Sequence, residues 1–149
     1  MKLGVNTYIW SADFTPARLS LLDTIKAHGF DGVEFPIFRP HLFEAAPIRR
    51  ACERLGLEPT TVASLLPDLS LIADDADVRR KTVTHLRDAI RVTADLGATQ
   101  FAGPLYAPVG YLPGRRRTAD EWQRAIECYQ QLGETLDENG VTLAIEPLN

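Results

Sequence analysis

The residue in this sequence that is best placed for chemistry is Glu146. It lies near the end of an apolar, strand-like run, residues 141–149, with the sequence V-T-L-A-I-E-P-L-N. A carboxylate at the tip of a buried strand is costly unless a metal ion or hydrogen bonds compensate it, so Glu146 is a site candidate. A second carboxylate, Glu34, ends an earlier run. It either anchors neighbouring backbone or an arginine, or it contacts a substrate.

The cysteines and histidines do not form a recognisable site. Cys52 and Cys128 each lie inside a helix-like segment, and we expect them to be free buried thiols in a reducing cytosol. The three histidines, His28, His41 and His85, do not have the spacing of metal ligands. We therefore do not expect them to bind a metal ion.

The elements that must position these residues are marked by four glycines. Each glycine follows a segment with helical periodicity, at the C′ position where the left-handed conformation favours glycine. They are Gly29, Gly56, Gly97 and Gly140. An apolar run follows each one, at 32–37, 59–65, 99–105 and 142–148, and a first run at 2–10 precedes them all.

Two helix starts also have clear signals. Thr15 and Pro16 supply an N-cap and a proline at the first helical position. Thr118 and Glu121 have the spacing of a capping box, in which the two residues hydrogen-bond to each other's backbone N–H. Both signals fit helices that follow loops after an apolar run.

The resulting order, β-α-β-α-β-α-β-α-β, predicts a parallel sheet with helices outside it. Two architectures fit, an open doubly wound sheet and a (β/α)8 TIM barrel. No G-x-G-x-x-G follows the first run, so the dinucleotide-binding version is not expected. Polar and aromatic residues end several strands, and in a barrel they would converge on the C-terminal face. Because a full barrel needs ~250 residues, we predict that residues 1–149 are its N-terminal part, with four βα units and a fifth parallel strand.

Composition narrows the class of protein. The 149 residues are 45% hydrophobic and 24% charged, as in ordinary soluble proteins. The net charge of −4 argues against a nucleic-acid partner. Residues 1–4 lack the apolar region of a signal peptide, and no run approaches the ~20 apolar residues of a membrane span. We expect a cytoplasmic protein with no membrane partner.

Three runs together resemble a known family. They are Gly29-Phe30-Asp31-Gly32-Val33-Glu34, Gln100-Phe101-Ala102-Gly103-Pro104-Leu105 and Leu143-Ala144-Ile145-Glu146-Pro147-Leu148-Asn149. They are similar to the xylose isomerase-like barrel superfamily, and most similar to its D-tagatose/D-psicose 3-epimerase branch. The resemblance covers the whole chain, but only the N-terminal portion of such an enzyme.

The resemblance implies a metal-dependent sugar isomerase or epimerase. Members of this branch bind manganese, cobalt or magnesium through two glutamates, an aspartate and a histidine, and Glu146 matches the first glutamate. Epimerising a ketose at C3 requires removal of a proton next to the carbonyl, and the metal stabilises the resulting enediolate. Glu146 is thus implied as metal ligand and as acid/base catalyst. The other ligands would lie beyond Asn149, so we expect this chain alone to be inactive and not to bind the metal tightly.

The resemblance also suggests which residues contact the sugar or sugar phosphate. Tyr8 and Trp10 would point the same way if they belong to one strand, and their rings suit the apolar face of a sugar; otherwise they are core aromatics. Glu34, Gly103 and Leu105 complete the expected substrate contacts, the last two near the distal end of the sugar. The run Arg115-Arg116-Arg117 either holds a sugar phosphate or forms a solvated loop.

Other functions stay open. Within the superfamily the alternatives are hydroxypyruvate isomerase, inosose dehydratase and sugar-phosphate epimerase. An endonuclease acting at abasic sites would need histidines at 64–68 and 103–106, where there are none. If the chain is not part of an enzyme, the remaining alternative is a non-catalytic half-barrel that is truncated or depends on a partner.

The expected half-barrel has two open edges, which favours self-association or pairing with a missing C-terminal half. We expect it to uncover apolar side chains of the barrel interior. Those we expect there are Val5, Val62, Phe101 and Ile145.

Overall fold

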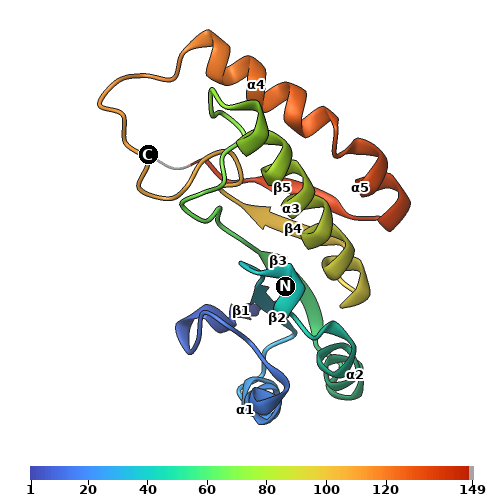
Figure 1. The fold of residues 1–149 in the computed structure, drawn as a ribbon. Coiled ribbons are helices and arrows are strands. Elements are labelled where there is room, and N and C mark those ends of the chain that lie inside the picture. The colour runs from blue at the N-terminus through green and yellow to red at the C-terminus, as the bar shows by residue number, and fades with distance from the viewer. Residues whose placement is uncertain (148–149) are drawn as a thin grey trace.

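Five parallel strands form one sheet in the order β1-β2-β3-β4-β5. The structure, a computed structural model, describes residues 1–147 (Figure 1). The strands are β1 (Gly4–Asn6), β2 (Gly32–Pro36), β3 (Glu58–Val62), β4 (Gln100–Gly103) and β5 (Thr142–Ile145). The helices are α1 (Ser20–Ala27), α2 (Ala45–Leu55), α3 (Ala76–Asp95), α4 (Ala119–Gln130) and α5 (Gly133–Asn139), with short 3-10 helices η1 (Thr7–Ile9), η2 (Pro16–Arg18) and η3 (Pro40–Leu42).

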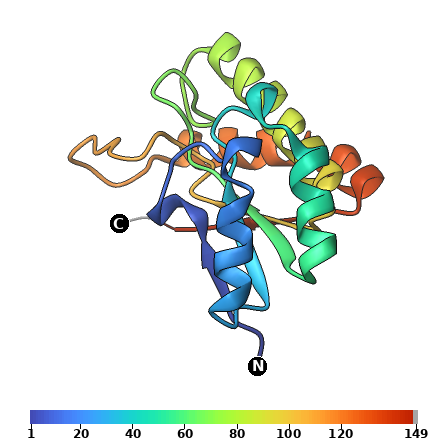
Figure 2. The ribbon, with the colours of Figure 1, turned by 90° about the horizontal axis from the view of Figure 1, so that it is seen from below.

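The strand order decides between the two predicted architectures. Each strand pairs with the next strand in the sequence, so the order never reverses as it does in a doubly wound sheet. The helices lie on the same side of the curved sheet (Figures 1 and 2). This is the arrangement expected of consecutive right-handed βα units, and the predicted four units with a fifth strand are confirmed.

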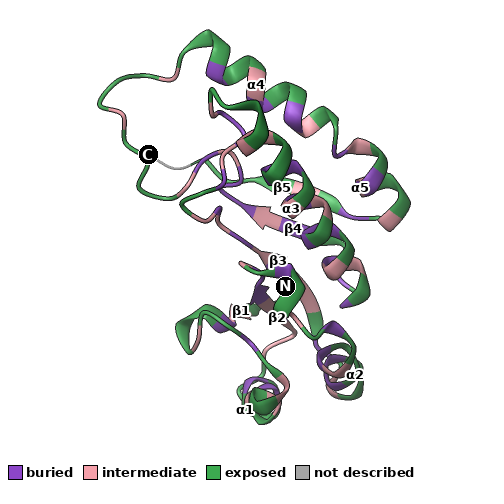
Figure 3. Ribbon diagram, viewed as in Figure 1, coloured by how far each residue is buried: buried purple, intermediate pink, exposed green. Residues whose placement is uncertain are grey.

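The outer face of the sheet carries the core. Phe35, Thr61, Phe101 and Leu143 are neighbours across β2 to β5, and the first three have no exposed surface. Two clusters of buried side chains join this face to the helices, and Figure 3 colours the buried positions purple along the ribbon. One cluster centres on α3 and the other on α1 and α2. The helices all cover this outer face, so the inner face of the sheet stays open.

The inner face carries small and polar residues. One row across β2 to β5 is Pro36, Val62, Ala102 and Ala144, and the row below it begins with Asn6, Glu34 and Thr60. Our prediction of which side chains face the barrel interior is therefore mostly wrong. Only Val62 faces inward, whereas Val5, Phe101 and Ile145 have the parity of the outer face.

Most local signals are confirmed. The four helix-ending glycines have φ between 60° and 84°. The capping box at the start of α4 is formed in both directions, with Thr118 accepting from the Glu121 N–H at 3.2 Å. The Thr15 side chain makes no cap bond, because Pro16 begins η2 rather than α1. Cys52 and Cys128 are free and buried, and burial raises the pKa of Cys52 to about 11.

No helix within residues 1–147 has the length and apolar character needed to cross a bilayer.

Candidate active site

Glu146 lies directly after β5, at the C-terminal edge of the sheet. Its backbone N–H donates to the carbonyl oxygen of Gly103 at 2.9 Å, which extends the β4–β5 pairing past Ile145. Because residues two apart on a strand share a face, Glu146 follows Ala144 onto the inner side. It is exposed, and its carboxylate receives no hydrogen bond from residues 1–147. The carboxylate is thus available to a partner, rather than held by a neighbouring strand.

Glu34, on β2, does have a partner, which sequence reasoning missed. The side-chain amide of Asn6 donates to Glu34 Oε2 at 2.6 Å across the β1–β2 pair. The hydroxyl of Thr7, which is fully buried, donates to the Glu34 carbonyl oxygen at 3.2 Å. These bonds hold Glu34 on the inner face without an arginine. The second carboxylate oxygen accepts nothing from the described residues, so it can still bind a ligand.

Tyr8 and Trp10 do not belong to a strand, so the prediction that they share strand parity is wrong. The side chain of Asn6 accepts a hydrogen bond from the Tyr8 N–H at 2.7 Å, and the chain turns into η1 after β1. Both rings are nonetheless exposed, 57% for Tyr8 and 45% for Trp10. Tyr8 packs edge-on against Phe38, which follows β2. Tyr8 therefore lies next to the Asn6–Glu34 pair, and neither aromatic residue belongs to the core.

Gly103 and Leu105 lie at the end of β4. A Cβ on Gly103 would lie 1.9 Å from the carbonyl oxygen of Ala63, and its φ is +139°. The position therefore requires glycine for close approach of the β3 and β4 backbones. The side chain of Leu105 is fully buried in the core cluster around α3. The residue as a whole, backbone included, therefore has no exposed surface through which it could contact a substrate in this structure.

The described residues, 1–147, supply only part of the donor set that a metal site would need. Glu146 supplies carboxylate oxygens of the kind that hard divalent cations prefer. However, no group of three or more His, Cys, Asp or Glu side chains within residues 1–147 lies close enough to hold an ion. Residues 1–147 can therefore supply one ligand to such a site, but not its full set of ligands.

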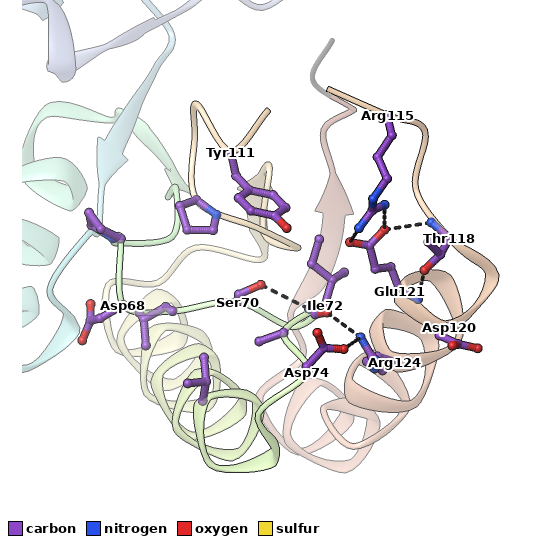
Figure 4. A pocket seen from close by; sticks show the side chains of 15 residues that line it. Asp68, Ser70, Ile72, Asp74, Tyr111, Arg115, Thr118, Asp120, Glu121 and Arg124 are labelled. Atoms are coloured by element: carbon purple, nitrogen blue, oxygen red, sulfur yellow. Dashed lines mark hydrogen bonds and ion pairs between the residues drawn. The ribbon is translucent and has the colours of Figure 1, made fainter. Parts of the chain in front are cut away.

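The arginine run borders a cavity of about 490 Å³ between the loops that precede α3 and α4 (Figure 4). Arg115 forms a bidentate pair with Glu121, at 2.9 and 3.1 Å, and Glu121 is nearly buried. Arg124, from α4, pairs with Asp74 at 2.6 Å. Both arginines that line the cavity are thus already neutralised by carboxylates, which does not favour a phosphate site there.

Arg117, the last residue of the run, turns away from that cavity. Its guanidinium lies 4.9 Å from the centre of the Tyr111 ring, and one nitrogen donates to the Tyr111 carbonyl oxygen at 3.3 Å. The run lies in a largely exposed loop, as the solvated-loop alternative predicts, and contacts within the chain additionally hold Arg115 and Arg117. No local sequence pattern indicated the pairing of Arg115 with Glu121, because it depends on how the loop before α4 folds.

The sequence matches a known protein family over most of its length. A family model described as "Xylose isomerase-like TIM barrel" matches residues 22–149. A probable ketose 3-epimerase from Synechocystis sp. is 33% identical over the whole chain, and an L-ribulose 3-epimerase from Mesorhizobium japonicum is 30% identical over 99% of it. The chain spans about half the length of these relatives, 52% and 50%.

Solved structures give the same picture. A structure of an L-ribulose 3-epimerase matches with a TM-score of 0.90 at 30% identity, covering 100% of this chain and 50% of that one. A D-allulose 3-epimerase from Methylomonas sp., solved with D-allulose, matches with a TM-score of 0.91 at 19% identity, covering 100% and 52%. The five-stranded sheet is therefore part of a TIM barrel, and its inner face is the lumen side.

Proposed function

The chain belongs to the xylose isomerase-like TIM barrel family, and from this premise we propose that it forms the N-terminal half of the barrel of a metal-dependent ketose 3-epimerase. The relatives that match it over its whole length and at 30% identity or more are a probable ketose 3-epimerase and an L-ribulose 3-epimerase. The particular substrates are those of the relatives. For this chain we propose only the substrate class, a ketose.

The observation that carries the proposal is the position of Glu146. A carboxylate that ends a lumen-side row on β5, with no hydrogen bond from residues 1–147 to neutralise it, is costly to bury in a closed barrel. A divalent cation or a substrate hydroxyl would compensate that charge. Barrel enzymes place their chemistry at this C-terminal face, so the location fits catalysis and not only structure.

Several residues of this chain would have distinct roles in the reaction at C3 of the ketose. Glu146 would remove or return the proton at C3, and its carboxylate would also bind the metal. When bound, the metal would act as a Lewis acid toward the oxygens of the sugar. Tyr8 and Trp10 would cover the apolar face of the sugar and exclude water. Glu34, held by Asn6, has one carboxylate oxygen left to accept a hydrogen bond from a sugar hydroxyl.

The rest of the site would come from the other half of the barrel. A second acid/base group is needed on the opposite face of the substrate carbon, because epimerisation returns the proton from the other side. The described residues do not supply it near Glu146. We therefore propose that residues 1–149 bind the metal only weakly by themselves.

The test is a chimera in which this chain is followed by the C-terminal half of the Synechocystis relative. We expect manganese-dependent exchange of configuration at C3 of D-fructose, D-tagatose or L-ribulose, measured by sugar chromatography, with kcat on the order of 1–10³ s⁻¹. Incorporation of solvent deuterium at C3 would identify the proton transfer. A chimera that unfolds cooperatively and binds manganese, but acts only on hydroxypyruvate or an inosose, would assign another reaction of the family.

A further inference from the structure

The cavity of about 490 Å³ between the loops that precede α3 and α4 lies beside the first turns of α4 (Figure 4). We call it the side cavity. Its volume falls within the ~300–1,000 Å³ that small-molecule sites in proteins usually have. Neither Glu34 nor Glu146 lines it, so the function proposed above does not account for it.

Ion pairs within the chain fix the wall of the side cavity. Arg115 and Glu121 form the bidentate pair at 2.9 and 3.1 Å. Arg124 joins α4 to the loop before α3, because it contacts Asp74 at 2.6 Å and donates to the Ile72 carbonyl oxygen at 3.2 Å. Charged side chains that are held by their own partners present their hydrogen-bonding atoms at set positions, which lowers the cost of ordering them on binding. The cavity is therefore pre-formed within this chain.

These pairs also leave the wall of the side cavity with little net charge. In addition to them, Asp68 contacts Lys81 of α3, and Asp120 is the one charged lining residue for which residues 1–147 supply no ion pair. A phosphate would have to displace Glu121 or Asp74 from its arginine. A metal ion finds no group of three or more suitable ligands in the described part of the chain. A neutral ligand therefore fits this wall best.

The lining residues keep hydrogen-bonding capacity that the paired charges do not use. Within residues 1–147 the hydroxyl of Tyr111 makes no hydrogen bond, and it points toward Ile72 (Figure 4). The Ser70 hydroxyl accepts the Ile72 N–H at 3.3 Å and still has its own proton to donate. Among the described residues, only one terminal nitrogen of Arg124 and one carboxylate oxygen of Asp74 have partners. Hydroxyl groups both donate and accept, so they can use all of these atoms, whereas an apolar ligand would leave them unpaired.

We propose that the side cavity binds a neutral polyhydroxylated compound about the size of a hexose, either a sugar or a sugar alcohol. The hydroxyls of Tyr111 and Ser70 and the free nitrogen of Arg124 bind its oxygens, and Asp74 accepts from one of its hydroxyls. Because these contacts are few and open to water at the rim, we expect a dissociation constant on the order of 1–10 mM. The site belongs to this chain alone and does not depend on the proposed epimerisation.

Binding is measured on the full chain by NMR, without any assay of turnover. Protein labelled with nitrogen-15 is titrated with D-fructose and, separately, with sorbitol, and we expect the amide signals of Ser70, Ile72 and Glu121 to move. Saturation transfer from the protein to each compound gives the affinities even if the chain self-associates. Equal affinities would show that the hydroxyls alone are recognised, and tighter binding of D-fructose would show that the cavity prefers a ketose.

Three variants locate the ligand. Tyr111→Phe removes the hydroxyl but keeps the ring beside Arg117, and it should weaken binding of both compounds about 3- to 10-fold. Tyr8→Phe, which removes the hydroxyl of an exposed tyrosine outside the side cavity, should not. Asp74→Asn keeps an oxygen for Arg124 but removes the compensating charge. Inorganic phosphate, which should not bind to the unmodified side cavity, should therefore bind to this variant.

Three results would overturn the proposal. The first is the absence of any change at Ser70, Ile72 and Glu121 when each compound is present at about ten times the expected dissociation constant. The second is binding that Tyr8→Phe weakens and Tyr111→Phe does not, since the sugar would then lie in the lumen. The third is binding of inorganic phosphate to the unmodified chain at the same amides, with release of the sugar, which would show that the ion pairs do not neutralise the wall.

Discussion

The amide of Asn6 and the carboxylate of Glu34 are joined by a 2.6 Å hydrogen bond directly across strands β1 and β2. The amide cannot turn over, because its oxygen accepts the Tyr8 N–H at 2.7 Å and its nitrogen must therefore face Glu34. One side chain thus ends β1, begins the turn that carries Tyr8, and fixes a lumen carboxylate. Asn6 positions two candidate substrate contacts at once.

Substitution of Asn6 should reveal this linkage as lost stability. Asn6→Ala removes a hydrogen bond to a charged acceptor, and we expect the free energy of unfolding to fall by about 1–2 kcal/mol. Asn6→Asp keeps the shape but places two carboxylates in contact, so the loss should be larger. Adding Glu34→Gln to Asn6→Asp should restore part of it by reversing the donor and acceptor. Urea unfolding measures all three, and an Asp variant as stable as the Ala variant would contradict the contact.

Gly103 should tolerate no side chain. A Cβ there would lie 1.9 Å from the Ala63 carbonyl oxygen, so Gly103→Ala must separate β3 from β4 and should cost roughly 3 kcal/mol or more. Gly29→Ala is the matched control, because Gly29 also has a positive φ, +84°, but no atom lies within 4 Å of its added Cβ. The control should cost only about 1–2 kcal/mol. Equal losses in thermal or urea unfolding would show that crowding at Ala63 is unimportant.

Glu121 should make stability depend on pH. The hydrogen bonds from Arg115, followed by the one from the Thr118 N–H, lower the pKa of Glu121 to about 2. Since the folded-state pKa lies below the unfolded one, the stabilisation is present above pH 4.5 and is lost as pH falls toward 2. Glu121→Gln should therefore lower the free energy of unfolding by about 1–2 kcal/mol at pH 7, and by little at pH 2.

The comparison for Glu121 is Glu138→Gln, which changes an exposed carboxylate at the end of α5. Its effect should stay within about 0.5 kcal/mol at every pH. A Glu121→Gln variant whose deficit stays constant between pH 7 and pH 2 would show that the pair with Arg115 does not respond to protonation.

The isolated chain should not epimerise sugars. Residues 1–147 supply one of the expected metal ligands and no second acid/base group near Glu146, so we expect no proton return from the opposite face. Purified residues 1–149 with manganese and D-fructose, D-psicose or D-tagatose should give no product by chromatography. Turnover with kcat on the order of 1–10³ s⁻¹ would show that the second half of the barrel is unnecessary.

In the chimeric barrel, Glu146→Gln should abolish most of the activity. The change removes a proton acceptor, for which a loss of about 10²- to 10⁴-fold in kcat is typical, and it also removes a charged ligand. Isothermal titration with manganese should therefore show weaker binding. Glu138→Gln in the same chimera provides the control. Wild-type turnover and manganese affinity in the Glu146→Gln protein would assign Glu146 a purely structural role.

The element order could be predicted because its signals are local. A helix that ends in a left-handed residue favours glycine, so Gly29, Gly56, Gly97 and Gly140 identified the ends of helices without knowledge of the fold. The position of Glu146 after the fifth strand followed in the same way. The choice of a barrel over a doubly wound sheet was not local, because it depends on which strands are neighbours.

The errors at the candidate site have physical causes of the same kind. Tyr8 and Trp10 were assigned to a strand because the apolar run continues through them, but the side chain of Asn6 competes with the sheet for the Tyr8 N–H. The partner of Glu34 depends on the register of β1 against β2, which one sequence does not specify. The burial of Leu105 depends on where β4 ends, and the structure ends it at Gly103.

The small and polar inner face has a consequence for how such a barrel would close. The rows that contain Asn6, Glu34, Ala102 and Ala144 can be wetted, so water is tolerated in the unfinished lumen. Exposed apolar surface of the half-barrel lies instead at its rim, around Trp122 and Ile145. Assembly would then be driven from the outside, by helix packing at the rim and by backbone pairing along β5. Water would leave the lumen last, when substrate and the remaining strands enclose it.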